Sequence, residues 1–153
     1  MGKSERGFTL AEVLAALAIM GMVISLAAQT MIWESRINTR GQMQIETHQA
    51  VRASMTVIER EIRQAKSVSL LSPGKLHITR SNNQTVYLYV DDKDFNGIRD
   101  LYMETDGIPN PVASYVEEVD FLQQAPGKWE VLIVARQGGV ENRWQLTVKQ
   151  RVN

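Results

Sequence analysis

The chain has 153 residues, 44% of them hydrophobic, and its 17 basic side chains balance its 17 acidic ones. A net charge of zero excludes broad electrostatic attraction to nucleic acid or anionic lipid, so nucleic-acid binding would need a local basic patch. The absence of cysteine excludes disulfides, thiolate metal sites and a cysteine nucleophile.

The first predicted element is a membrane-spanning helix. No charged side chain occurs between Val13 and Trp33, and this run reaches the roughly 20 apolar residues that cross a bilayer. The short polar segment before it contains Lys3 and Arg6, which favours the cytoplasmic side for the N-terminus and the outside for the rest of the chain. Two alternatives are a signal peptide cleaved near Ala27 and a plain signal anchor.

A carboxylate near the start of this apolar run needs an explanation. An ionisable group at the centre of a membrane costs about 2.5–3.5 kcal/mol, and the helix dipole offsets only about 0.3–1 kcal/mol of that cost for Glu12 in the first turn. The surrounding sequence, GFTLAEVL at positions 7–14, resembles the G-F-T-L-x-E-x-L processing site of type IV pilins and type II secretion pseudopilins.

This resemblance assigns roles to the N-terminal residues. It implies that a prepilin peptidase cleaves after Gly7 and methylates the new N-terminus at Phe8, so that residues 1–7 are a cleaved leader and residues 8–33 a transmembrane, filament-core helix. Four residues of helix rise about 6 Å. We therefore expect Glu12 to act in assembly, by pairing with the Phe8 amine of a neighbouring subunit shifted along a filament.

The apolar pattern then becomes amphipathic, which predicts that the same helix continues over residues 34–66. We expect the acid-first pair Glu59 and Arg63 on its exposed side. Residues 53–65 are similar to the helix end of J-type or PilW-like minor pilins and pseudopilins. The expected apolar stripe comprises Ile37, Gly41, Ile45, His48, Val51, Met55, Ile58, Ile62 and Ala65.

A period of two predicts a β-rich globular head over residues 67–153. Turn formers separate the expected strands, which cover residues 76–80, 85–90, 99–104, 115–123, 129–136 and 143–152. They predict one antiparallel sheet of about five or six strands. The face expected to pack on residues 51–62 of the helix comprises Ile78, Tyr87, Tyr89, Val119, Phe121, Leu132, Val134, Trp144, Leu146 and Val148.

The predicted fold class is therefore α+β, with a long N-terminal helix packed on an antiparallel sheet. The pilin resemblance implies the same architecture, a lollipop with a helical stem and a β-rich head.

One loop of the head is a candidate calcium site. Residues 92–100 follow the pattern D-x-D-x-N-G-x-x-D, and oxygen ligands at alternate positions around a turn-forming glycine suit this ion. The candidate ligands are Asp92, Asp94, Asn96, the Ile98 carbonyl and Asp100. Met103 stands where an EF-hand has its closing glutamate, and the alternative is a solvated turn. A bound ion would stabilise the head rather than take part in chemistry.

No catalytic set is evident. His48 and His77 lack a nucleophile motif around them, and the sequence has neither a phosphate-binding glycine loop nor a His-x-x-x-His pair. We expect His48 to pack on the helix and His77 to lie in a strand. An enzyme is not expected.

The resemblance implies a non-enzymatic minor pilin or pseudopilin. Its partners would be the prepilin peptidase, other major and minor pilins or pseudopilins, the inner-membrane assembly platform and the membrane itself, without direct nucleic-acid binding. It would reside in the inner membrane as a single-pass protein with its head outside the cytoplasm, and then enter a type IV pilus, a type II secretion pseudopilus or a competence filament, in a tip or initiation complex. The alternative is a monomeric single-pass membrane-anchored protein whose head binds a ligand.

Overall fold

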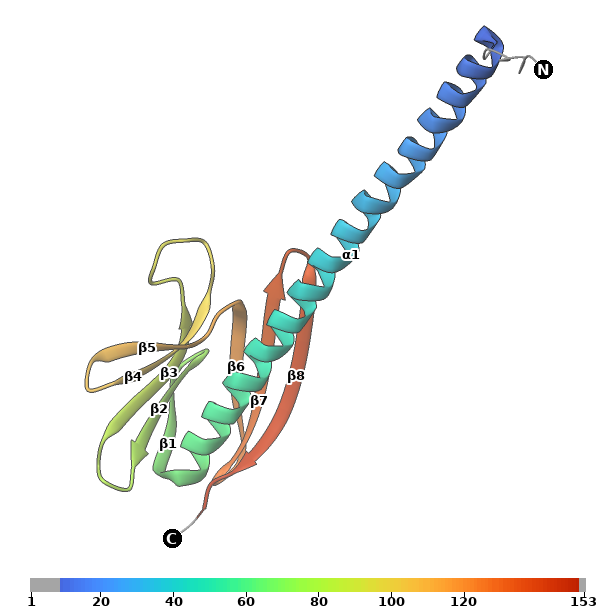
Figure 1. Ribbon diagram of the computed structural model, residues 1–153. Helices are drawn as coiled ribbons and strands as arrows, with labels where there is room; N and C mark the ends of the chain where they lie inside the picture. The colour runs from blue at the N-terminus through green and yellow to red at the C-terminus, as the bar shows by residue number, and fades with distance from the viewer. Residues whose placement is uncertain (1–8, 152–153) are drawn as a thin grey trace, which may run out of the picture. The chain divides into compact units, whose positions relative to one another are not determined.

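The computed structural model describes residues 9–151, which contain one helix and eight strands (Figure 1). The elements are α1 Leu10–Gln64, β1 Ala65–Ser72, β2 Lys75–Arg80, β3 Thr85–Asp91, β4 Asp100–Thr105, β5 Ile108–Ala113, β6 Val116–Ala125, β7 Lys128–Gln137 and β8 Val140–Lys149. The chain divides into two compact units between residues 39 and 40, so α1 belongs to both. The predicted α+β class is confirmed.

The first unit contains residues 10–39 of α1, whose side chains are all exposed. Leucine, alanine and methionine are frequent here and are strong helix formers. Helix α1 is long and apolar enough near the N-terminus to cross a membrane. An apolar surface of this extent is stable only against lipid or another protein chain.

In the second unit, one face of residues 40–64 of α1 packs on the sheets. Val51, Ile58 and Ile62 are buried, as predicted, whereas Ile45 is 58% exposed and His48 is also exposed. The predicted stripe is wrong at these two positions and at Ile37 of the first unit, which is exposed as well. The difference arises because small polar residues take part in the buried face, notably Thr47 and Ser54.

The hydroxyl groups of these two residues are satisfied within the helix itself. Ser54 Oγ donates to the Ala50 carbonyl at 2.8 Å, and Thr47 Oγ1 donates to the Met43 carbonyl at 2.9 Å. A hydroxyl that is already paired can be buried without a large penalty. A prediction from polarity treats such residues as exposed. The predicted stripe therefore contained Ile45 and His48, which are exposed, and left out Thr47 and Ser54, which are buried.

The strands form two antiparallel sheets, one with the order β1-β2-β3-β4-β5 and one with the order β6-β7-β8. The prediction of a single sheet of five or six strands is therefore wrong. Sequence reasoning missed β1, which begins directly after α1 at Ala65, inside the predicted helix, and β5. Strand β5 contains Pro109 and Pro111 and lies at a sheet edge, where proline is tolerated.

The core-facing side was also misassigned on strand β3. Val86 and Leu88 of β3 are fully buried in the core cluster, whereas Tyr87 and Tyr89 do not belong to it. Because side chains alternate along a strand, a prediction displaced by one residue exchanges the two faces. On β3 both faces carry large apolar or aromatic groups, so alternation alone did not distinguish them.

On β7, Val131, Ile133 and Ala135 belong to the core cluster, and of the two predicted residues Val134 is buried whereas Leu132 is only half-buried. On β8, Val148 is buried as predicted, but Trp144 is 47% exposed.

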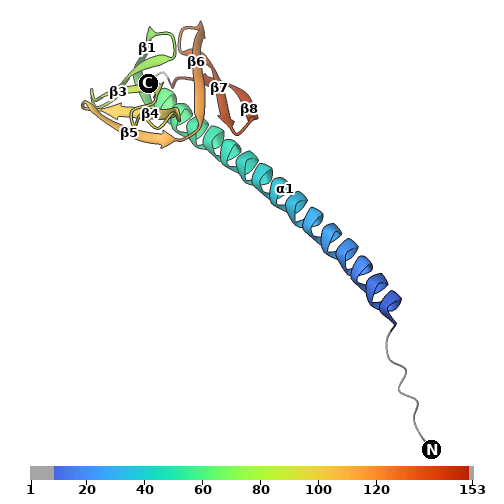
Figure 2. The same ribbon diagram turned by 90° about the horizontal axis from the view of Figure 1, so that it is seen from above.

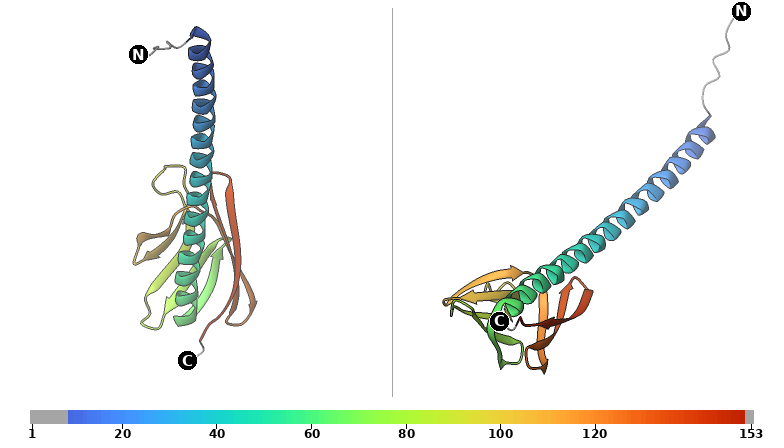
Figure 3. Two further views of the ribbon diagram at one scale, coloured as in Figure 1. Left: turned by 45° about the vertical axis from the view of Figure 1, so that its right-hand side comes forward. Right: turned by 90° about the horizontal axis from the view of Figure 1, so that it is seen from below.

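The hydrophobic core lies between the sheets and the second part of α1. Figures 2 and 3 show the strands β1–β5 on one side of this helix segment and β6–β8 on the other. Strand β6 contacts β2, β3 and β4 of the other sheet and so joins the two walls. The predicted core residues Ile78, Val119 and Phe121 are confirmed, and Trp129 is the largest fully buried side chain.

Candidate functional site: the start of helix α1

The predicted processing site is only partly within the described residues. Gly7 and Phe8 lie outside them, whereas Glu12 lies in the first turn of α1. Its Oε2 accepts hydrogen bonds from the Thr9 backbone N–H at 2.9 Å and from the Thr9 hydroxyl at 3.0 Å, and the Glu12 backbone N–H donates to Thr9 Oγ1 at 3.3 Å. The two side chains therefore cap the helix reciprocally.

This arrangement is a capping box, in which a Ser or Thr at the N-cap and a Glu three residues later satisfy each other's backbone donors. The signal is present in the sequence as Thr9-Leu10-Ala11-Glu12, whereas the sequence prediction gave Glu12 a partner only in another subunit. Within residues 9–151, no hydrogen bond reaches the second carboxylate oxygen, Oε1. Glu12 is therefore held in place by its own chain and still offers one oxygen to a partner.

The predicted calcium loop connects β3 to β4 and is organised by main-chain contacts. Asp92 Oδ1 accepts the Asn96 N–H at 3.1 Å, Asp92 Oδ2 accepts the Gly97 N–H at 3.0 Å, and Asn96 Oδ1 accepts the Ile98 N–H at 2.7 Å. Asx side chains that accept such bonds stabilise a turn without any ion.

The acidic residues of this loop do not converge. Asp100 is buried at the start of β4, with its Oδ1 unpaired, while Asp94 is exposed. Across the described part of the chain, no three His, Cys, Asp or Glu side chains are placed to hold a metal ion. Each Asp92 carboxylate oxygen accepts one amide N–H and keeps a second lone pair. These hydrogen bonds are therefore compatible with an ion, and calcium binding at this loop stays a prediction.

The two histidines have ordinary structural surroundings. Nδ1 of His77 lies 3.1 Å from Ser69 Oγ on the strand pair β1–β2, and its ring is 5.2 Å from that of Tyr87. His48 is exposed beside Trp144, with ring centroids 6.4 Å apart. The prediction that His77 lies in a strand is confirmed, whereas His48 is at the surface rather than packed within the core.

A second carboxylate of α1, Glu61, is buried and could be mistaken for a reactive group. Its Oε2 accepts from Arg80 Nε at 2.8 Å and its Oε1 from Arg80 Nη2 at 2.9 Å, with Arg60 at 3.2 Å as a further partner. The hydrogen bond to Glu61 raises the pKa of Arg80 above its ordinary value. This bidentate pair connects α1 to β2 and is structural.

Comparison with known proteins supports the assignment made for the helix start. Residues 2–28 match the family described as the prokaryotic N-terminal methylation motif. No curated protein and no solved structure gives a match to this chain. The matched segment contains Thr9, Glu12 and most of the apolar run, and it indicates a pilin-like precursor that a prepilin peptidase processes and that assembles with other pilins as a structural subunit.

Proposed function

We propose that the protein is a minor pilin or minor pseudopilin that, after processing, enters a filament as part of a tip or initiation complex. The observation that carries this proposal is the combination, at one helix start, of a capped but incompletely satisfied Glu12 with an exposed apolar surface. Lipid can cover the apolar surface of a lone subunit, but lipid offers no partner for a carboxylate. A neighbouring subunit offers both an apolar surface and a partner for the carboxylate.

Processing would create the partner of Glu12. Hydrolysis of the Gly7–Phe8 peptide bond leaves a carboxylate on Gly7 and an amine on Phe8, and the peptidase then adds a methyl group from a methyl donor to this amine. The amine is cationic at neutral pH. Pairing between the Phe8 ammonium of one subunit and Glu12 Oε1 of the next places opposite charges together inside the filament core, where low polarity strengthens their attraction.

In this proposal the unassembled subunit resides in the inner membrane with its head outside the cytoplasm. The inner-membrane assembly platform extracts it, and burial of apolar surface against neighbouring helices stabilises the product by about 25 cal/mol per Å². We favour a PilW-like pilus component over the J-type pseudopilin and competence alternatives, because only the helix end at residues 53–65 resembles the J-type branch.

The alternative function is a monomeric membrane-anchored protein whose head binds a ligand. A groove beside α1, lined by Ile45, His48, Met55 and Trp144 among others, is the feature that favours it. This alternative gives Glu12 no role beyond the capping box, so the two functions predict different consequences of processing and of changing Glu12.

The mass of the protein after co-expression with a prepilin peptidase tests the proposal. We expect the wild type to lose residues 1–7 and to gain one methyl group on Phe8, and the Gly7→Ala variant to remain largely uncut. A complete N-terminus in the wild type, or a cut near Ala27, would contradict the proposal in favour of an anchored or a freely secreted head.

Assembly is tested separately with Glu12→Gln, which preserves side-chain size and removes the charge. We expect normal cleavage but loss of the variant from sheared filaments or from cross-linked subunit pairs, whereas Glu34→Gln on the same helix should assemble normally. Normal incorporation of the Glu12→Gln protein would favour the monomeric alternative.

A further inference from the structure

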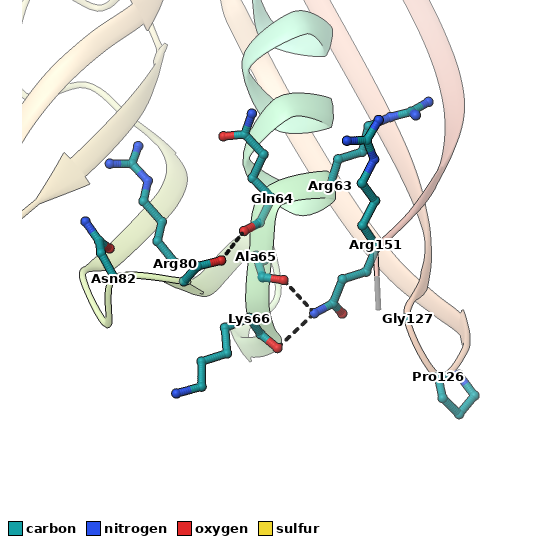
Figure 4. Close-up of a pocket in the computed structure, with 11 residues that line it drawn as sticks. Arg63, Gln64, Ala65, Lys66, Arg80, Asn82, Pro126, Gly127 and Arg151 are labelled. Carbon is teal, nitrogen blue, oxygen red and sulfur yellow. Dashed lines mark hydrogen bonds between the residues drawn. The ribbon is translucent and has the colours of Figure 1, made fainter. Parts of the chain in front are cut away.

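The end of the head at which α1 terminates carries a cluster of positive charge. Figure 4 shows the hollow at this end, about 910 Å³ in volume, between the end of α1, the β2–β3 and β6–β7 turns and the end of β8. Among the described residues, its lining includes Arg63, Lys66, Arg80 and Arg151 and no acidic residue.

Hydrogen bonds from the Gln150 side chain and from the backbone hold the separate segments of this end together. Gln150 Nε2 donates to the carbonyls of Ala65 and Lys66 at 2.9 and 3.0 Å, and the Gln150 N–H donates to the Gly127 carbonyl at 2.7 Å. The Arg151 N–H donates to the Arg63 carbonyl at 3.3 Å. The cations that these segments carry are therefore gathered by the fold.

Two of the lining arginines are neutralised within the protein. Arg80 pairs with buried Glu61, and Arg63 lies 2.6 Å from Glu59. The sheet then adds two further lysines beside the hollow, since Lys128 follows Gly127 directly and is the register partner of Lys149 across β7 and β8.

Four cations remain, which together we call the basic pole: Lys66, Lys128, Lys149 and Arg151. All four are exposed, and none forms a salt bridge with any residue in the described range 9–151.

The fold itself explains only part of this cluster. Cations near the end of a helix interact favourably with its dipole, which accounts for Lys66. Like charges directly opposite each other on adjacent strands are destabilising, so the Lys128–Lys149 pair opposes folding. A pair that costs stability and has no salt-bridge partner among residues 9–151 indicates an anion from outside.

We propose that the basic pole binds the phosphate groups of a single nucleic-acid strand. Stable protein interfaces have a core of apolar and aromatic anchors, but among residues 9–151 the only apolar side chains lining this hollow are those of Ala65 and Pro126. A partner held here is therefore held by charge, as phosphate backbones are. Zero net charge gave no indication of this site, because its members come from three separate segments of the sequence.

The inference is independent of the proposed filament function and can be tested on the full chain in an uncharged detergent. The probe is a fluorescein-labelled 15-mer of deoxythymidine, with binding measured by fluorescence anisotropy across salt concentrations. Four phosphate contacts predict a slope of about −3 for log K against log salt, so binding should weaken about 50-fold between 50 and 200 mM salt.

Variants locate the site. The double variant Lys128→Gln/Lys149→Gln should reduce the magnitude of the slope by about 1.4, since each phosphate contact contributes about 0.7. Arg52→Gln/Arg99→Gln removes the same charge from exposed positions on α1 and in the β3–β4 loop and should leave the slope unchanged. The lysine variant should also unfold at the same temperature as the wild type or higher, because it removes a repulsive pair.

Three results would overturn the proposal: no binding at 50 mM salt, an equal loss of slope in both double variants, or tighter binding of a polyglutamate peptide than of the oligonucleotide. The last result would assign the basic pole to an acidic protein partner.

Discussion

Two carboxylates of helix α1, those of Glu12 and Glu61, accept hydrogen bonds from partners at very different distances along the chain. Glu12, in the exposed first unit, is bonded by Thr9, three residues away in the sequence. Glu61, in the second unit, is buried and bonded by Arg80, which is 19 residues away and on a strand. The first arrangement forms with one turn of helix, whereas the second exists only when the head is folded.

This difference suits Glu12 to the proposed assembly contact and Glu61 to the stability of the folded head. A group satisfied by its nearest neighbours in the chain can exchange partners without disturbing the core, which is what the proposed filament contact requires of Glu12. A group satisfied across elements cannot do so, because its release leaves a charge in an apolar interior. The unit of residues 10–39 is accordingly available for partners, and the head is a closed structure on which surface sites are displayed.

The largest expected effect is at Glu61. Glu61→Ala leaves Arg80 without its partner, and we expect a loss of about 3–5 kcal/mol in the free energy of unfolding, measured by chemical denaturation of the full chain in detergent. Glu59→Ala removes the exposed partner of Arg63 and should cost about 0.5 kcal/mol or less. Equal losses in the two variants would contradict the distinction between the buried and the exposed pair.

A buried and an exposed isoleucine of α1 give a second comparison between the core and the surface of the protein. Ile58 is fully buried, and Ile58→Ala should destabilise the head by about 2–5 kcal/mol through lost burial and a residual cavity. Ile45 lies on the same helix but is 58% exposed, so Ile45→Ala should change stability by about 0.5 kcal/mol or less. A large loss at Ile45 would mean that the groove beside α1 is covered in the protein as it exists in solution.

Calcium would act on the head alone. If the ion binds the loop between β3 and β4 with Asp94 among its ligands, calcium at about 100 times its dissociation constant should stabilise the head by about 2.7 kcal/mol. Asp94→Asn should abolish this stabilisation and leave the turn intact, because the turn depends on Asp92 and Asn96. An unchanged unfolding temperature up to millimolar calcium would leave the loop as the amide-capped turn that the structure shows.

The capping box predicts a smaller and strictly local effect. Thr9→Val removes the hydroxyl that caps α1 and should destabilise the first turn by about 1 kcal/mol, seen as faster exchange of the amide hydrogens of Leu10 to Glu12 in micelles. Thr9→Ser should restore slow exchange, and neither variant should change the unfolding of the head. A change in the head would contradict the separation of the two units.

The smallest effect concerns alkaline pH. Burial, followed by the contact of its hydroxyl with Glu104, raises the pKa of Tyr89. The folded head therefore retains this proton to higher pH than the unfolded chain, and the associated stability is complete below about pH 10 and is lost as pH rises further. Tyr89→Phe should weaken this alkaline dependence, as measured by unfolding between pH 8 and pH 11; an unchanged profile would exclude Tyr89 as its source.

The accuracy of the sequence predictions followed the locality of the interactions. The long helix, the turns and most strands depend on periodicity within a few residues and were predicted correctly. Strand β1 was missed because most of its side chains are exposed and show no clear alternation. The face of β3 was misassigned because Tyr87 and Tyr89 are as consistent with a core as Val86 and Leu88, and only packing against α1 distinguishes them.

The candidate site divides in the same way. The G-F-T-L-A-E segment was recognised from the sequence, and its capping box could also have been recognised there, because every atom involved lies within four residues. The basic pole could not, since Lys66, Lys128, Lys149 and Arg151 are separated by up to 85 residues in the chain. The segments that carry them are joined only when Gln150 bonds to the carbonyls of Ala65 and Lys66.

The sequence by itself therefore determined the pilin-like helix start, the apolar run and the α+β class, since each is encoded by contiguous residues. Only the tertiary structure decided the division into two sheets, the buried pair of Glu61 with Arg80 and the joining of segments whose cations form no salt bridge within residues 9–151. Hydrogen bonds and charge interactions act over a few ångströms, and chain folding alone determines which distant residues come within that range.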